Sequence, residues 1–234
     1  MASQLFLGIL AFLPALSIVY FVLGAQEEFF RDQAMFVAMI GGLVLGLLVA
    51  IAERFILQDA SVLFVVLAFP LVETMAKTML VGLPRFRDRE ETVLLGGAAG
   101  AMMAAMLVVF YVQYVAGEPT TWQLLVKVLA AAIGLTGAHF VSGLRLGLGP
   151  ARGSITSGFL ASLLWLIPAH AILGFLGLVP VQRGLAVVPL EGSWVTAAIL
   201  ALYGIVVFVW KTPVFMERGL PRDQRRKLRE EGLF

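Results

Sequence analysis

The sequence predicts an all-α membrane protein, a polytopic bundle of about seven transmembrane helices. Hydrophobic residues make up 60% of the 234 residues and charged residues only 14%. The mean hydropathy is +0.96. Apolar runs of about 20 residues, the length at which a helix crosses a bilayer, recur along the whole chain. We therefore expect a helical membrane domain over residues 1–211 and no separate soluble domain.

The predicted helices are separated by short polar links. The first apolar run follows Met1-Ala2-Ser3-Gln4, which lacks the basic residues of a signal peptide, so we expect a retained span. Later links are the polar stretch 25–33, the charged stretch 85–91, the turn 117–121 and the connection 180–193. The predicted spans are 5–24, 34–53, 60–83, 93–116, 122–146, 155–178 and 193–211.

Small residues recur at helical spacing on three of these spans. They allow helix backbones to approach closely in lipid, where van der Waals packing holds helices together. The pattern predicts tight helix pairs and carries no chemistry. The residues concerned are Gly42 with Gly46, Gly96 with Gly100 and Ala104, and Gly143 with Gly147.

Basic residues predict the orientation of the chain. They follow the third span at Arg85, Arg87 and Arg89 and the fifth span at Arg145 and Arg152. Lys and Arg near the ends of spans favour the cytoplasmic side, and the alternation of spans places these links and the C-terminus on that side.

The segment 212–234 is expected to be a basic cytoplasmic tail. From residue 211 onward it contains seven basic and four acidic residues. Such a segment suits anionic lipid headgroups or a partner protein, and nucleic acid is not an expected partner. The expected contact residues are Arg222, Arg225, Arg226, Lys227 and Arg229.

Four ionisable residues lie inside the predicted spans: Glu73, Lys77, His139 and His170. An ionised group at the bilayer centre costs about 2.5 to 3.5 kcal/mol on the insertion scale, so such residues face the protein interior and have partners. Glu73 precedes Lys77 by four residues, on one face of a helix. At about 1.5 Å per residue, all four can lie near mid-membrane. Whether the two histidines share one site is left open by the sequence.

These residues allow two interpretations. Glu73 could act as general base on a water molecule, with a histidine holding the water or stabilising the oxyanion. On residue types alone we favour a structural role instead, in which Lys77 offsets Glu73 and each histidine bonds a neighbouring helix. Two histidines on adjacent helices also fit haem ligation, but no further motif supports it. The chain has no cysteine, which excludes a disulfide, a thiolate nucleophile and a cysteine-based metal site. We expect no metal and no cofactor.

Other carboxylates are expected near solvent. Glu27, Glu28 and Arg31 fall in the polar link between the first two spans, where solvation explains them. Glu53 and Arg54 end the second predicted span, so we expect both at the membrane interface.

The third predicted span reads F-P-L-V-E-T-M-A-K-T-M-L-V from Phe69 to Val81, and a charged link and the Gly-rich stretch 96–101 follow it. This order resembles the PrsW family of intramembrane glutamic-type proteases over residues 65–178. The resemblance rests on P-x-x-E-x-x-x-K at Pro70, Glu73 and Lys77 and on the later His139 and His170. It implies Glu73, His139 and His170 as catalytic residues and Lys77 as a supporting one. The prenyl-protein endopeptidases are a more distant match.

The chain departs from the PrsW pattern at three places. Thr74 replaces the second glutamate of the first motif, Gly174 replaces the asparagine after the last histidine, and residues 100–110 contain no carboxylate in place of the Glu-Asn motif. These losses remove groups that a two-carboxylate mechanism uses to share a proton.

We therefore expect a catalytically silent PrsW-like protein that binds other membrane proteins as an accessory or scaffold subunit. The alternative is a divergent intramembrane protease that cuts a membrane-bound protein. A transporter for small ions or lipids is a third possibility, but no inverted repeat or paired broken helices support it. The expected location is a prokaryotic cell membrane, crossed several times.

Overall fold

The computed structural model describes residues 2–24, 31–57, 62–84, 86, 91–114, 122–151, 154–176, 194–219 and 226. Within these residues the chain forms seven α-helices and one short π-helix and contains no strand, which confirms the all-α prediction. The elements are α1 (Ala2–Ser17), η1 (Ile18–Leu23), α2 (Asp32–Leu57), α3 (Val62–Val81), α4 (Thr92–Tyr114), α5 (Trp122–Ala151), α6 (Ile155–Leu176) and α7 (Trp194–Gly219).

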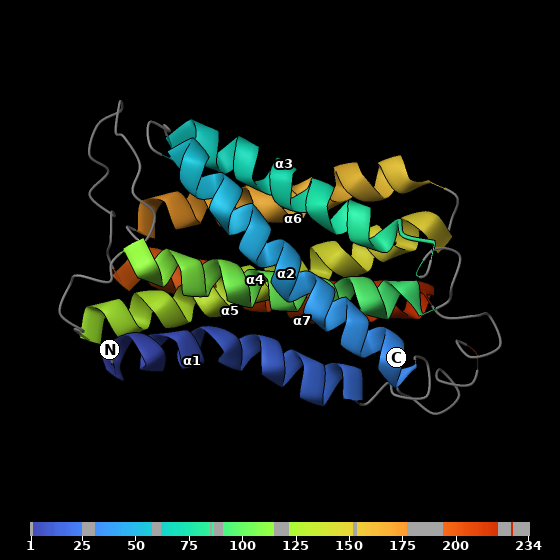
Figure 1. Ribbon diagram of the computed structural model, residues 1–234, viewed down its shortest axis with the longest axis horizontal. Coiled ribbons are helices and arrows are strands. Elements are labelled where there is room, and N and C mark those ends of the chain that lie inside the picture. Colours follow the sequence, from blue (N-terminus) through green and yellow to red (C-terminus); the bar gives the residue numbers. More distant parts are fainter. Residues whose placement is uncertain are drawn as a thin grey trace.

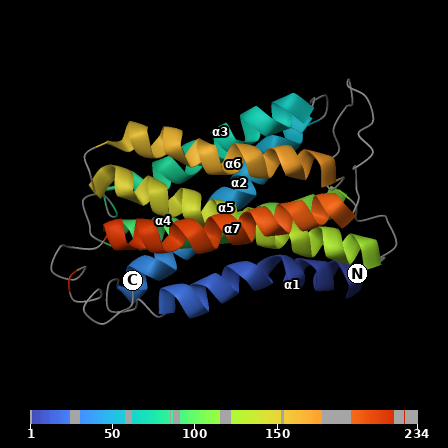
Figure 2. The same ribbon diagram turned by 180° about the vertical axis from the view of Figure 1, so that it is seen from behind.

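The helices form one elongated bundle and alternate in direction (Figures 1 and 2). Helices α4 and α5 form its interior: 83% of the apolar window of α4 is buried, against 17% of the window that spans α1 and η1. Helices α3 and α6 lie together on one side of this pair, α7 packs on α5, and α2 crosses α4 obliquely. The core is therefore built on two helices, and the other helices surround them.

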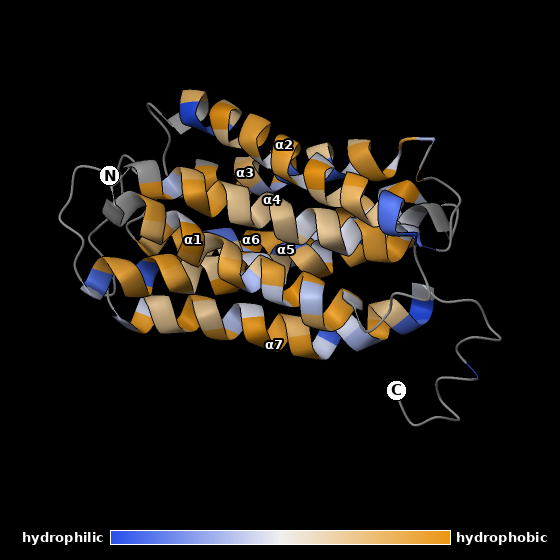
Figure 3. Cartoon of the chain, turned by 60° about the horizontal axis from the view of Figure 1, so that its bottom comes forward, coloured by the Kyte–Doolittle hydropathy of each residue, from blue (hydrophilic) through white to orange (hydrophobic). Residues whose placement is uncertain are grey.

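The outer surface is apolar. Six helices are long and apolar enough to cross a membrane, judged by length and composition over the described residues. Large apolar side chains cover α1, η1, α2 and α7, and polar residues gather toward the ends of the bundle (Figure 3). A contiguous apolar surface of this kind is typical of contact with lipid. Side chains that are more than half exposed include Tyr20, Phe21, Phe36, Phe55, Leu202 and Val209.

Glycines bring the central helices into backbone contact. A Cβ atom on Gly100 would collide with the carbonyl group of His139, and one on Gly143 would collide with that of Gly96. On α2, a Cβ on Gly42 would collide with the backbone of Ala99 on α4. These contacts confirm the predicted close pairs. The α4–α5 contact also fixes the height of His139 in the bundle.

The three helices that the basic stretches were predicted to follow end on the same side of the bundle. Because the helices alternate, the C-terminal ends of α3, α5 and α7 lie at the same end of the bundle (Figure 1). Helix α7 continues to Gly219, past the predicted end of the last span at residue 211. Of the basic residues predicted to contact lipid or a partner, Arg226 is exposed, whereas the other four lie outside the described residues: Arg222, Arg225, Lys227 and Arg229.

Candidate functional site

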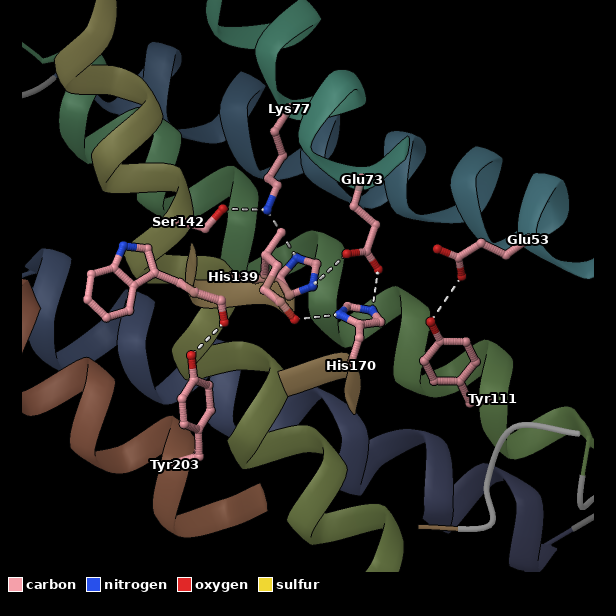
Figure 4. A network of polar contacts seen from close by, with 10 residues as sticks. Glu53, Glu73, Lys77, Tyr111, His139, Ser142, His170 and Tyr203 are labelled. Carbon is pink, nitrogen blue, oxygen red and sulfur yellow. Dashed lines mark hydrogen bonds and ion pairs between the residues drawn. The ribbon is translucent and has the colours of Figure 1, made fainter. Parts of the chain in front are cut away.

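The four ionisable residues that interrupt the predicted spans share one interior space. Glu73 and Lys77 come from α3, His139 from α5 and His170 from α6, and their side chains converge between the three helices (Figure 4). Glu73, His139 and His170 are 0% exposed, and Lys77 is 2% exposed. Both histidines belong to one cluster, which settles the question that the sequence left open.

The helix contacts explain why these side chains meet. Helix α3 packs along α6, and each contains a proline shortly before its cluster residue, Pro70 before Glu73 and Pro168 before His170. A proline inside a helix removes one backbone hydrogen bond and bends the helix locally. Ser162 on α6 donates a hydrogen bond of 2.9 Å to the carbonyl oxygen of Ser142 on α5. The three helices are therefore held together on the side where the cluster forms.

His170 and Glu73 share a proton. Nδ1 of His170 lies 3.0 Å from the carbonyl oxygen of Leu166, and because a carbonyl only accepts, this nitrogen carries a hydrogen. Nε2 of the same ring lies 3.0 Å from Oε1 of Glu73. Two bare acceptors would repel each other at this distance, so one proton lies between Nε2 and the carboxyl group. The pair holds this proton either as an imidazolium beside a carboxylate or as a neutral imidazole beside a carboxylic acid.

His139 is oriented by Lys77. Nζ of Lys77 donates to Oγ of Ser142 at 2.8 Å and lies 3.5 Å from Nδ1 of His139. In its ammonium form Lys77 has no lone pair, so Nδ1 of His139 then faces it as an acceptor and the ring hydrogen lies on Nε2. Nε2 in turn lies 3.4 Å from Oε2 of Glu73. Lys77 thus selects the form of His139 that presents an N–H group to the Glu73 side.

Two polar atoms at the centre of the cluster have no partner other than each other, at a distance long for a hydrogen bond. They are Oε2 of Glu73 and Nε2 of His139, an acceptor and a donor that face the same space. Buried polar atoms are nearly always paired, because leaving one unpaired costs about 1 to 3 kcal/mol. Because their mutual contact of 3.4 Å is weak, both atoms can still bond a polar group that enters the cluster.

Glu53 was expected at the membrane interface, and this expectation is wrong. Its side chain is 0% exposed, and Tyr111 on α4 donates a hydrogen bond of 2.9 Å to its Oε2 atom. Helix α2 continues to Leu57, so Glu53 lies within the helix and its carboxyl group points into the bundle toward Glu73 (Figure 4). A carboxylate at the last residue of the predicted span 34–53 gave no sequence signal of burial.

Arg31 was expected to be a solvated residue of a polar link, but it has a specific partner. Its Nη2 and Nε atoms lie 2.8 and 3.2 Å from Oε1 of Glu91, and its backbone N–H donates to Oε2 at 2.9 Å. The contact joins the start of α2 to the residue before α4. Glu27 and Glu28, from the same predicted link, lie outside the described residues.

Three residues of the cluster offer a ligand set for a metal ion: Glu73, His139 and His170. One carboxylate oxygen and two imidazole nitrogens lie within 4.8 Å of one another. Zinc and iron(II) accept such sets, and the bond of His170 Nδ1 to a backbone carbonyl is typical of metal-binding histidines. The Lys77 ammonium beside His139 is unfavourable for a dication at the same place. The residues therefore fit a protonated network better than a metal centre.

Comparisons with known proteins identify no relative: no protein-family model, no curated protein and no solved structure matches the chain.

Proposed function

We propose that this chain is an intramembrane protease that hydrolyses a membrane-bound protein substrate. The observation that carries the proposal is the weak contact of 3.4 Å between two buried polar atoms, Oε2 of Glu73 and Nε2 of His139, which have no other hydrogen-bond partner. One atom can accept a proton and the other can donate a hydrogen bond. Hydrolysis of a peptide bond requires these two functions at adjacent positions.

The chemistry follows from the contacts. Oε2 of Glu73 takes a proton from a water molecule as the water oxygen attacks the substrate carbonyl carbon. The N–H group at Nε2 of His139 donates to the oxyanion that forms on the carbonyl oxygen. His170 keeps the Glu73 carboxyl group in place through its contact with Oε1. Lys77 holds His139 in the donating form and supplies positive charge near the oxyanion.

The order of residues supports the same proposal. The sequence resembles the PrsW family at Pro70, Glu73, Lys77, His139 and His170, and the last four belong to one buried cluster. A protein that only bound others would gain nothing from keeping several ionisable groups inside the membrane, where each is costly unless it is paired.

The second candidate is the catalytically silent accessory subunit, and one observation favours it. The Glu73 and His139 side chains are fully enclosed, so a substrate reaches them only after the helices move. Thr74 and Gly174, which stand where the PrsW pattern has a glutamate and an asparagine, also favour it. We place the protease first because the cluster holds a carboxylate beside an imidazole N–H group with only a weak contact between them, which provides a base and a donor at adjacent positions.

The test compares membranes from cells that produce the native chain with membranes from cells that produce Glu73→Gln. Protein N-termini are mapped by mass spectrometry after a short induction. We expect fragments cut within or beside apolar segments in the native sample and their absence in the variant sample. Identical sets of N-termini in the two samples would contradict the protease and leave the accessory role.

We further propose a cytoplasmic C-terminus, with the basic tail at anionic lipid headgroups. The excess of Lys and Arg beyond α3, α5 and α7 supports this orientation. A reporter protein fused after Phe234 should then be active in the cytoplasm. Activity only on the opposite side of the membrane would reverse the topology.

A further inference from the structure

Glu53 has a buried carboxyl group that the mechanism above does not use. Its side chain is 0% exposed, and it comes from α2. Oε2 accepts a hydrogen bond from the Tyr111 hydroxyl, while Oε1 has no partner among the described residues. Burying a carboxyl group with one oxygen unpaired is costly, so its retention calls for an explanation.

The open oxygen of Glu53 belongs to the same region as the open oxygen of Glu73. In Figure 4 the Glu53 side chain extends from α2 toward Glu73 on α3, with Tyr111 beneath it. Both carboxyl groups are fully buried, so water screens little of the interaction between charges placed on them. Each has one oxygen fixed, Oε2 of Glu53 by Tyr111 and Oε1 of Glu73 by His170, and one oxygen unpaired.

Two carboxyl groups in such a position do not both stay ionised without water. Like charges at short range in a medium of low dielectric constant repel strongly, so neighbouring buried carboxyl groups hold a proton between them. The Glu73 oxygens face two histidines and a lysine, and the Glu53 oxygens face a hydroxyl group. The cationic groups therefore stabilise the ionised form on Glu73, and the proton belongs on Glu53.

Peptide hydrolysis needs a protonated group that can act as an acid. When the tetrahedral intermediate collapses, the carbon–nitrogen bond breaks and the departing amine must receive a proton. The mechanism proposed above provides a base and an oxyanion donor but does not name the group that protonates the amine. Glu53 is a carboxyl group on the other side of Glu73 from Lys77 in Figure 4, where it can take this role.

We propose that Glu53 is the second catalytic residue of the site, the acid that protonates the leaving amine, and that Tyr111 is its positioning residue. The inference rests on the proposed protease function. In one turnover Glu73 gains a proton from water and Glu53 gives one to the amine. The proton on Glu73 then passes to Glu53, which restores both groups, and the net reaction is addition of one water across the peptide bond. Glu53 thus replaces the second carboxylate that the chain lacks at Thr74 and in residues 100–110.

The first experiment detects the proton without any substrate. Infrared spectra of the purified protein in lipid vesicles at neutral pH, recorded in H₂O and D₂O, should contain the carbonyl band of a buried protonated carboxyl group. The band should be absent in Glu53→Gln, which keeps the shape and the acceptor for Tyr111. It should shift in Tyr111→Phe, which removes only the hydrogen bond, and it should be unchanged in the matched control Glu91→Gln. A band that persists in Glu53→Gln, or that the native protein lacks, overturns the proposal.

The second experiment measures cleavage by the fragment-mapping comparison described above. Glu53→Gln should slow fragment release by about 10²- to 10⁴-fold, the usual contribution of a general acid. Glu91→Gln should release fragments at the native rate. If Glu73→Gln is inactive and Glu53→Gln cuts like the native chain, Glu53 has no catalytic role and Glu73 remains the base.

The two experiments separate the two proposals. If the native chain and Glu73→Gln yield the same fragments, the protease function fails, and the catalytic role of Glu53 fails with it. If Glu53→Gln does not fold, the Tyr111→Phe spectrum becomes the test: a band that shifts belongs to Glu53, whereas a band that stays where it was does not come from Glu53 and overturns the proposal.

Discussion

Glu91 and Glu73 are two carboxylates of the same bundle that are satisfied in different ways. Glu91 lies at one end of the bundle, and a partly exposed arginine, Arg31, supplies three donors to its two oxygens. Glu73 lies in the interior between two histidines, is fully buried, and keeps one oxygen without a hydrogen bond. Both oxygens of Glu91 are hydrogen-bonded, whereas Oε2 of Glu73 has only a weak contact of 3.4 Å with Nε2 of His139.

The difference separates a structural ion pair from a reactive one. A carboxylate paired with arginine holds helix ends together and has no free lone pair directed at a buried space. A carboxylate between histidines can exchange protons, because imidazole and carboxyl groups differ less in proton affinity than guanidinium and carboxyl groups do. Neutralising each glutamate in turn should therefore affect different properties of the protein.

The largest expected effect is that of Glu73→Gln on cleavage. The substitution keeps size and removes the base, so we expect fragment release to fall by about 10²- to 10⁴-fold. The same substitution at Glu91 should leave cleavage unchanged. Comparing both variants in one fragment-mapping series checks the contrast, and equal losses at the two positions would show that the loss reports folding rather than chemistry.

An intermediate effect is expected from Gly100→Ala, which acts on the helix pair that positions His139. The new methyl group would collide with the carbonyl group of His139, so α4 and α5 must separate or shift. Overpacking of this kind costs about 1 to 3 kcal/mol. Thermal unfolding in detergent should show the loss as a lower Tm. Gly8→Ala is the matched control, because nothing lies within 4 Å of its new methyl group, and its Tm should not fall.

The smallest expected effect is that of Arg31→Gln. The Arg31 side chain is 62% exposed, and ion pairs at such positions contribute about 0 to 1 kcal/mol. The Tm should fall slightly, and the difference from the native protein should shrink as salt is added. A loss of cleavage in this variant would mean that the bundle end and the interior cluster are coupled. It would contradict the separation of the structural Arg31–Glu91 pair from the reactive Glu73 cluster.

The sequence predicted the elements of this site that carry a strong signal. The four ionisable residues of the cluster stand out because they interrupt long apolar runs. The helical spacing of small residues predicted the backbone contacts on which the position of His139 depends, including those at Gly96, Gly100 and Gly143. Both signals come from the cost of polar or bulky groups at helix contacts in lipid.

The sequence did not predict the role of Glu53, because burial depends on where α2 crosses its neighbours. Near the end of an apolar run, a glutamate that faces water and one that turns into the bundle look the same. Tyr111 and Ser142 gave no signal either, since a single hydroxyl group in a helix is cheap to bury once it is bonded. The partner of Arg31 was missed because it lies 60 residues away along the chain.

The measurement that tests the account most directly is cleavage by the double variant Glu73→Gln with Lys77→Met. The single change at Glu73 leaves Lys77 buried beside His139 and Ser142 without its counter-charge, so it can lower stability as well as activity. The double change removes both charges, which should restore a native-like Tm while fragment release stays about 10²-fold or more below that of the native chain. A double variant that is folded and cuts membrane proteins at the native rate would contradict the account, because Glu73 would then not be the base.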